Sequence, residues 1–275
     1  MDSIVKRRII AAVLLFAVAQ LFAWPWASSQ DLHTQSAAAV LAREFADPDI
    51  SYLLLDADGQ IMAQRWDRPE RDIPVGSLTK PFMAVAYSRT HRSFPKFHCA
   101  GGKTCWFPRG HGTLAVREAI AFSCNSYFHQ LVAQAGSGFR PAMENFALHG
   151  AGDHEKAQSF TTASPLALAR AFLELTHHAG EREVRPVLEG LALSAKSGTA
   201  KAVDAALPGI TALAKTGTAP CTHKKKAPGD GFALVMFPAE RPRALLLVRL
   251  HGRPGFMAAA IAGRMVAKVE GGAAR

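Results

Sequence analysis

Segments with strand character lie at both ends of this chain, and helical segments fill the middle. Near the N-terminus, two alternating apolar runs within residues 51–66 flank Asp58-Gly59, a dipeptide typical of a type I′ hairpin turn. Three short apolar runs, at residues 210–220, 231–240 and 243–252, follow one another near the C-terminus. This order predicts a mixed α/β (α+β) fold, with an antiparallel five-stranded sheet built from both chain ends, flanked by helices, and an all-helical lobe.

Helical periodicity marks the middle of the chain and its end. Residues 113–122, 127–136 and 255–269 carry apolar side chains at helical spacing. The clearest helix start is Ser164, an expected N-cap that Pro165 follows at the first helical position. By contrast, residues 90–112 are rich in Gly, Pro, Cys and His, which predicts a long loop.

The first 28 residues have the character of an export or membrane segment. Three positive charges precede the apolar run Ile9–Trp24, which is shorter than the roughly 20 residues of a membrane span and suits a signal-peptide core. A cleaved signal peptide and a retained N-terminal membrane anchor both stay open for residues 1–28. Either one places the rest of the chain on the extracytoplasmic face of the inner membrane, in the periplasm, anchored or secreted. We expect residues 29–48 to form a linker with a short helix, and residues 49–272 to form the folded domain.

The chain is basic, which restricts its partners. Its 32 Lys and Arg residues exceed its 22 Asp and Glu residues, giving a net charge of +10. Such a charge fits nucleic acid, a membrane surface or another anionic polymer such as cell-wall material. Because the sequence has neither zinc-finger spacing nor an aromatic-rich single-strand signature, we expect no nucleic-acid binding.

The cysteines of an exported protein are expected to pair. Cys99 and Cys105 lie close together in a short Gly-rich segment, so we suspect a disulfide between them. A zinc site with the flanking His98 and His111 is the alternative, but the spacing matches no common ligand pattern. We therefore assign no metal and no cofactor.

Cys124 lies between apolar helical segments and is expected to be buried and structural. A Cys124–Cys221 bridge is a further alternative.

A hydroxyl and an amine stand one helical turn apart at Ser77 and Lys80, where turn residues give way to an apolar run. Residues i and i+3 share a helix face, so the amine can act as the base that a Ser nucleophile needs, provided that its pKa is lowered. The same Ser-x-x-Lys spacing recurs at Ser93 and Lys96, where Pro95 prevents a helix. The pair Ser77 and Lys80 alone is therefore weak evidence of a catalytic site.

Two further motifs follow in the chain. Ser123-Cys124-Asn125 lies between two helical segments, and Lys215-Thr216-Gly217-Thr218 ends an apolar strand segment. Ser-x-x-Lys, a central Ser-x-Asn and Lys-Thr-Gly together resemble the signature of the penicillin-binding protein transpeptidase domain, within the serine β-lactamase and DD-peptidase superfamily. The resemblance extends over nearly all of residues 50–269. Within it, Lys196-Ser197-Gly198 is interpreted as a decoy and Lys215 as the motif lysine.

The resemblance implies a role for each motif residue. Ser77 would attack the carbonyl of a D-Ala-D-Ala peptide or a β-lactam, and Lys80 would take its proton. Ser123 would relay a proton to the leaving amine, with Lys215 close by, and Asn125 would bind the substrate and hold Lys80.

In the third motif, the amide of Thr218 would join that of Ser77 in the oxyanion hole. The hydroxyls of Thr216 and Thr218 would bind the substrate carboxylate, and Gly217 would leave room for the substrate.

The implied function is a peptidoglycan DD-transpeptidase, with DD-carboxypeptidase as a variant, that penicillin acylates. A β-lactam or muropeptide sensor that acylates without turnover, and a class D-like β-lactamase, are the alternatives. The chain lacks the Glu-x-x-Leu-Asn stretch of class A β-lactamases before Lys215, and class D enzymes more often carry Val than Asn at position 125. The implied partners are peptidoglycan stem peptides, β-lactams, the cell membrane through the N-terminal segment, and other cell-wall proteins.

Overall fold

The computed structural model describes residues 29–146, 162–221 and 229–273. The chain divides into two compact units, residues 1–35 and residues 36–275, and the second contains the whole sheet. The predicted signal peptide or anchor, residues 1–28, lies outside the described residues. Among the helices that are described, none has the length and apolar character needed to cross a bilayer.

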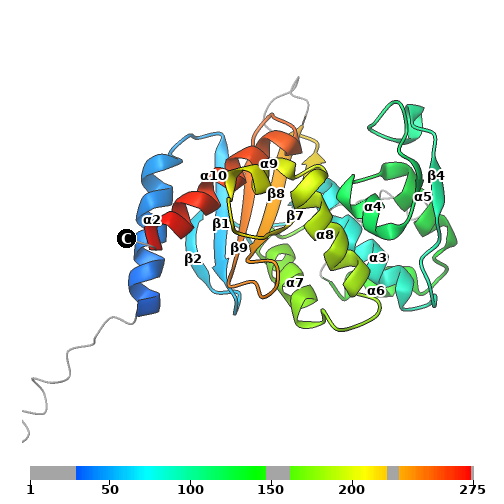
Figure 1. The fold of residues 1–275 in the computed structure, drawn as a ribbon, viewed down its shortest axis with the longest axis horizontal. Coiled ribbons are helices and arrows are strands. Elements are labelled where there is room, and N and C mark those ends of the chain that lie inside the picture. Colours follow the sequence, from blue (N-terminus) through cyan, green and yellow to red (C-terminus); the bar gives the residue numbers. More distant parts are fainter. Residues whose placement is uncertain (1–28, 147–161, 222–228, 274–275) are drawn as a thin grey trace, which may run out of the picture. The chain divides into compact units, whose positions relative to one another are not determined.

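One antiparallel five-stranded sheet, in the order β2-β1-β9-β8-β7, joins the two ends of the chain. Its strands are β1 (Ile50–Asp56), β2 (Ile61–Arg65), β7 (Leu213–Ala219), β8 (Asp230–Phe237) and β9 (Ala244–Leu250). The N-terminal hairpin meets the C-terminal meander where β1 pairs with β9, with Leu53 opposite Leu247. The fold class predicted from the strand order is therefore confirmed, and β7 is left as an edge strand (Figure 1).

The hairpin is confirmed, but its predicted type I′ turn is wrong. That turn needs positive φ at both central residues, and of the pair Asp58-Gly59 only Gly59 has it, at 74°. The carboxylate of Asp56 instead accepts hydrogen bonds from the amides of Asp58 (3.0 Å) and Gln60 (2.8 Å). A side chain that caps the turn in this way makes a second left-handed residue unnecessary.

Helices cover both faces of the sheet. The helices are α2 (Ser29–Glu44), α3 (Lys80–Ser88), α4 (Val116–Ala121), α5 (Asn125–Gln134), α6 (Phe139–Glu144), α7 (Pro165–His177), α8 (Arg185–Ser197), α9 (Lys201–Ala206) and α10 (Gly255–Ala273), with 3-10 turns η1 (Gly76–Thr79) and η2 (Gly102–Thr104). Along each central strand, alternate residues enter two separate cores. Leu53, Leu234 and Leu247 pack toward α3 and α7, whereas their neighbours pack with α9, α10 and residues 37–45. Burial on both faces explains the nearly continuous apolar runs.

The start of α7 follows the predicted capping pattern. Ser164 accepts a hydrogen bond from the Ala167 amide at 3.1 Å, and Pro165 opens the helix. Near the start of α7, β6 (Thr162–Ala163) pairs with β3 (Ile73–Pro74), just before η1.

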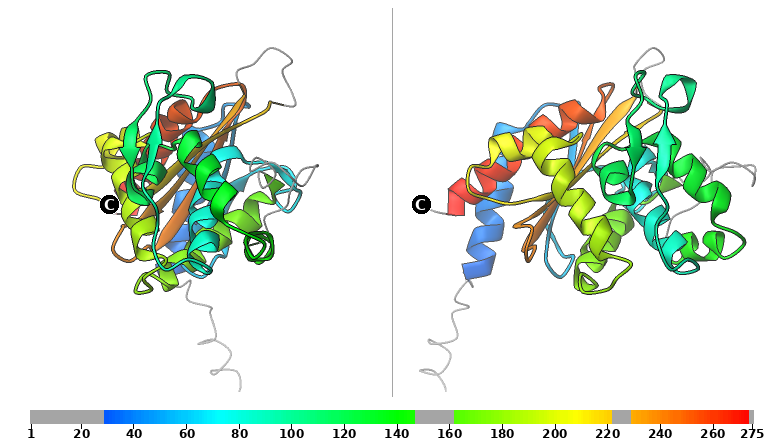
Figure 2. Two further views of the ribbon diagram at one scale, coloured as in Figure 1. Left: turned by 90° about the vertical axis from the view of Figure 1, so that its right-hand side faces the viewer. Right: turned by 45° about the vertical axis from the view of Figure 1, so that its right-hand side comes forward.

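Residues 90–112 are not wholly the loop that the composition predicts. β4 (Phe97–Cys99) pairs with β5 (Gly112–Leu114) to form a short hairpin, with η2 inside its connection. Figure 2 shows this hairpin beside α5, in the helical lobe away from the sheet. The two strands pair through only three residues each, and strands this short give no recognisable pattern in the sequence.

Candidate active site

Ser77 and Lys80 enter the site from one tight turn. Ser77 lies in η1 and is partly exposed, whereas Lys80 is the first residue of α3 and is buried. The sequence places both on one helix, but the structure puts Ser77 in the 3-10 turn before it. Since side chains at i and i+3 eclipse each other in a 3-10 turn, the two still share a face.

The buried Lys80 amine is held by the second motif. Its Nζ donates to the carbonyl oxygen of Ser123 at 2.7 Å and to Oδ1 of Asn125 at 2.6 Å, and lies 3.3 Å from Oγ of Ser123. Burial lowers the pKa of Lys80 to about 7, although the thiols of Cys124 and Cys105 act in the opposite direction. A neutral amine has only two N–H bonds to donate. With both taken by oxygen acceptors, its lone pair is available to receive a proton.

Lys215 approaches the same serine from β7. It is fully buried, and its Nζ donates to Oγ of Ser123 at 2.9 Å and to the carbonyl oxygen of Thr216 at 2.8 Å. Burial, with the charge of Lys80 as a second cause, holds the pKa of Lys215 well below its usual range. The two amines contact the same hydroxyl, and repulsion between like charges disfavours the state in which both are protonated. The titrations of Lys80 and Lys215 are therefore coupled.

Ser123 sits on a strained connection between α4 and α5. Its φ is 51°, a left-handed conformation that is uncommon for a residue with a side chain. The indole Nε1 of Trp106 donates to the carbonyl oxygens of Phe122 (3.1 Å) and Ser123 (3.2 Å). Backbone strain at a residue whose hydroxyl contacts two lysines is the pattern expected of a functional site.

The third motif packs directly against the turn that carries Ser77. A Cβ at Gly76, where φ is 56°, would lie 2.2 Å from the carbonyl oxygen of Thr218, and one at Gly217 would lie 2.8 Å from that of Val75. Only glycine at both positions lets β7 approach η1 this closely. The approach brings the backbone of Thr218 against that of Gly76, the residue before Ser77.

The two threonine hydroxyls of this motif differ. Thr218 is exposed, and its Oγ1 accepts a hydrogen bond from the Gly255 amide at 3.1 Å. Thr216 is buried and donates to Oγ1 of Thr199 at 2.6 Å. Thr199 contacts this motif but was not predicted, because it comes from the connection between α8 and α9 and no sequence pattern links it to β7.

The competing motif copies lie elsewhere. Lys196 is exposed near the C-terminal end of α8, and Ser93 and Lys96 are exposed on a segment without helical structure. The structure thus brings Ser77, Lys80, Ser123, Asn125 and the Lys215 motif together and leaves both decoys outside.

The cysteine predictions need correction. Cys99 and Cys105 are free thiols in the structure, which does not form the bridge suspected between them. Nδ1 of His111 lies 3.6 Å from the sulfur of Cys99 and 3.5 Å from that of Cys105. Cys124 is fully buried, as predicted, and faces Cys105 at 3.9 Å rather than forming a bridge with Cys221.

Comparison with known proteins identifies the fold. No protein-family model and no curated protein matches the sequence. The TP domain of penicillin-binding protein 3 from Burkholderia pseudomallei is 17% identical, with a TM-score of 0.66 over 88% of this chain and 92% of that one. PBP2 from Pseudomonas aeruginosa, in complex with WCK 5153, is 17% identical, with a TM-score of 0.69 over 88% of this chain and 74% of that one. PBPA from Mycobacterium tuberculosis is also 17% identical, with a TM-score of 0.67 over 88% of this chain and 80% of that one.

These structures share an architecture with the present chain despite their low identity. The fold is that of the transpeptidase domains of penicillin-binding proteins, as the three motifs predicted.

Proposed function

We propose that this chain is a serine acyltransferase that acts on the D-Ala-D-Ala peptides of peptidoglycan. DD-transpeptidation is the favoured reaction, DD-carboxypeptidation is its variant, and penicillin acylates the same serine. One observation carries the proposal: the buried amines of Lys80 and Lys215 both contact the Ser123 hydroxyl, and Lys80 follows Ser77 by one turn. A proton path of this kind is what serine acyl transfer needs.

Acylation follows from this geometry. The neutral Lys80 amine takes the proton of the Ser77 hydroxyl as its oxygen attacks the substrate carbonyl, and a tetrahedral oxyanion forms. The amides of Ser77 and Thr218 stabilise this oxyanion, each donor contributing about 3–4 kcal/mol in comparable sites. When the C–N bond breaks, Ser123 gives its proton to the leaving D-alanine amine and regains one from Lys80. The ester then passes to an acceptor amine, or to water.

The edge position of β7 supports the binding of a peptide. An extended substrate can add to the open backbone edge of a strand. The exposed Thr218 hydroxyl lies at this edge and is suited to the terminal carboxylate. Thr216 contributes by fixing the strand through Thr199.

The location and partners belong to the same proposal. Residues 1–28 would hold or deliver the domain to the extracytoplasmic face of the membrane, where peptidoglycan lies. One structural neighbour, PBP2 from Helicobacter pylori, was solved in complex with MreC, which supports the idea of cell-wall protein partners. A ceftriaxone acyl-enzyme complex of the mycobacterial PBPA supports reaction with β-lactams.

The acyl-enzyme is expected to be long-lived, which separates a transpeptidase from a β-lactamase. Fast hydrolysis needs a base that activates water on the ester. In the described residues, no carboxylate contacts Lys80, Ser123 or Lys215, and the hydrogen bond from Lys80 to Asn125 disfavours carbamylation of the amine. Intact-mass spectrometry after penicillin should show one adduct, on Ser77, that lasts minutes or longer. Rapid multiple turnover of nitrocefin without a trapped adduct would identify a β-lactamase instead.

Acylation should also depend on pH, with a single rise near neutrality. Because the base is the neutral Lys80 amine and burial lowers its pKa to about 7, the protonated and inactive form dominates below that pH. We expect the second-order rate of penicillin labelling to rise about tenfold per pH unit in the acidic range and to level off above neutrality. A rate that is flat between mildly acidic and mildly basic pH, with an intact circular dichroism spectrum throughout, would rule out Lys80 as this base.

A further inference from the structure

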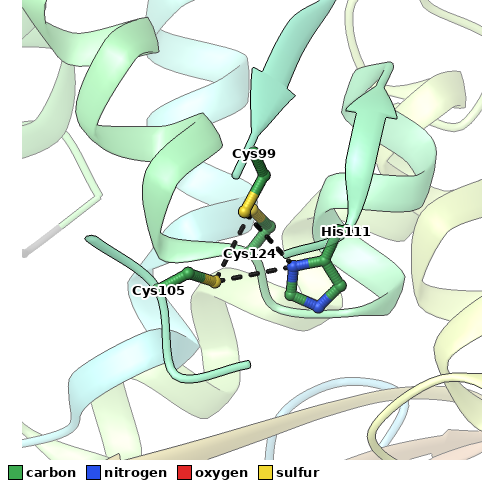
Figure 3. Close-up of side chains that lie close together, drawn as sticks. All are labelled: Cys99, Cys105, His111 and Cys124. Carbon is green, nitrogen blue, oxygen red and sulfur yellow. Dashed lines mark hydrogen bonds between the residues drawn. The ribbon is translucent and has the colours of Figure 1, made fainter. Parts of the chain in front are cut away.

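A cluster of side chains outside the proton path has the geometry of a metal site. Cys99 in β4, Cys105 after η2, His111 before β5 and Cys124 between α4 and α5 converge on one point (Figure 3). The three sulfurs and Nδ1 of His111 all lie within 4.8 Å of one another. The three cysteines are buried, and the histidine is half-buried.

We infer that these four residues form a structural zinc site of the Cys₃His type. A tetrahedral zinc ion with Zn–S bonds of about 2.3 Å and a Zn–N bond of about 2.0–2.1 Å separates its ligands by about 3.8 Å (S to S) and 3.6 Å (S to N). The sulfurs of Cys105 and Cys124 are 3.9 Å apart, and Nδ1 of His111 lies 3.6 and 3.5 Å from two sulfurs. The side chains thus stand at the distances of ligands that share one ion.

The connection between the ligands is shaped to hold them. At Gly101 a Cβ would lie 2.3 Å from the amide nitrogen of Gly110, and the Gly102 amide donates to the Pro108 carbonyl at 3.1 Å. This compact loop returns the chain from Cys99 to His111.

Aromatic rings confine the histidine. The His111 ring lies 5.6 Å from that of Trp106, 5.1 Å from that of Phe107 and 6.0 Å from that of Phe122. Its orientation, with Nδ1 toward the sulfurs, is therefore fixed by packing before any ion binds.

Backbone amides also point at the sulfurs. Cys124 caps α5, and its sulfur accepts a hydrogen bond from the Tyr127 amide at 3.4 Å. The sulfur of Cys99 accepts from the backbone of Gly101 and of His111. Amide donors and a helix N-terminus stabilise thiolates, which are the form that binds zinc. Since all four positions are protein ligands, the ion would have no open position, which marks a structural site.

The consequence concerns the second catalytic motif. Cys124 stands between Ser123 and Asn125, both of which contact Lys80. A zinc ion would tie this strained segment to the hairpin of β4 and β5 and thereby position the two residues. The zinc alternative in the sequence included Cys99, Cys105 and His111 but took His98 in place of Cys124, because the ligand spacing follows no familiar pattern and depends on a hairpin that was expected to be a loop.

Metal analysis of the full chain, purified without chelators, tests the inference independently of any enzymatic activity. We expect about one zinc ion per chain by elemental mass spectrometry, and cobalt substitution should give the intense visible absorption of a tetrahedral thiolate site. Cys105→Ser should lose both signals. Cys221→Ser, which alters the cysteine outside the cluster, should keep both.

Several outcomes would overturn the site. An intact mass lighter by two hydrogens would show a disulfide in place of the metal thiolates. Equal zinc content in the wild-type chain and Cys105→Ser would place the ion elsewhere. Failure of the wild-type chain to take up zinc or cobalt, with all its thiols open to alkylation, would refute the site even if Cys105→Ser did not fold.

Discussion

Replacing Ser77 by alanine is expected to abolish covalent labelling by a fluorescent penicillin. The reason is chemical: without the hydroxyl oxygen no ester can form, whatever the remaining site binds. Ser77 is partly exposed and lies three residues before the buried Lys80, and Gly76 and Gly217 permit the close approach of its turn to β7. Labelling is read by gel fluorescence, and the modified peptide is identified by mass spectrometry.

The chain carries its own control for this experiment. Ser93 has the same spacing to Lys96 that Ser77 has to Lys80, but both are exposed on a segment without helical structure. Ser93→Ala should therefore label like the wild type. Labelling that persists in Ser77→Ala would place the nucleophile elsewhere and remove the basis of the proposed function.

The sheet could be predicted because its signals are local. Each strand is a short apolar run with clear ends. Because both faces of the sheet are buried, the runs are almost continuously apolar and stand out in the sequence. The order of these runs along the chain was enough to predict that they share one sheet. The turn type was not predictable, because the carboxylate of Asp56 replaces the second left-handed residue that Asp58-Gly59 suggested.

Helix α8 shows why other elements were missed. Its N-cap, Val184, makes no side-chain capping bond, and Gly190 interrupts the helical pattern. In the fold that glycine is required, since a Cβ there would lie 2.9 Å from the carbonyl oxygen of Arg117 in α4. A residue that reads locally as a helix breaker is explained only by the neighbouring helix.

The candidate site shows the same difference between features with a local sequence signal and features that depend on contacts between distant elements. The three motifs were visible because each is contiguous, and their positions on a turn, a helix junction and a strand could be expected. Thr199, and Cys124 as the fourth member of the cysteine cluster, were not visible, since their partners come from other elements. The pairing of β4 with β5 brings Cys99 toward His111, and no pattern along the chain encodes that contact.

The second large effect is expected at Lys215. Lys215→Ala should slow penicillin acylation by roughly 10²–10³-fold, the range typical for loss of a group that assists proton transfer. The substitution removes the hydrogen bond from Nζ to the Ser123 hydroxyl and leaves Lys80 to hold the proton alone. The measurement is the second-order rate of labelling, with circular dichroism to confirm the fold, because a truncated core residue can also destabilise.

Lys196→Ala is the matched control, because Lys196 heads the competing Lys-Ser-Gly triplet but is exposed near the end of α8. It should change the rate little. In both variants the rise in acylation rate should stay near neutral pH, because burial is the main cause of the lowered pKa of Lys80. Equal losses of rate in both variants would mean that β7 does not supply the second amine.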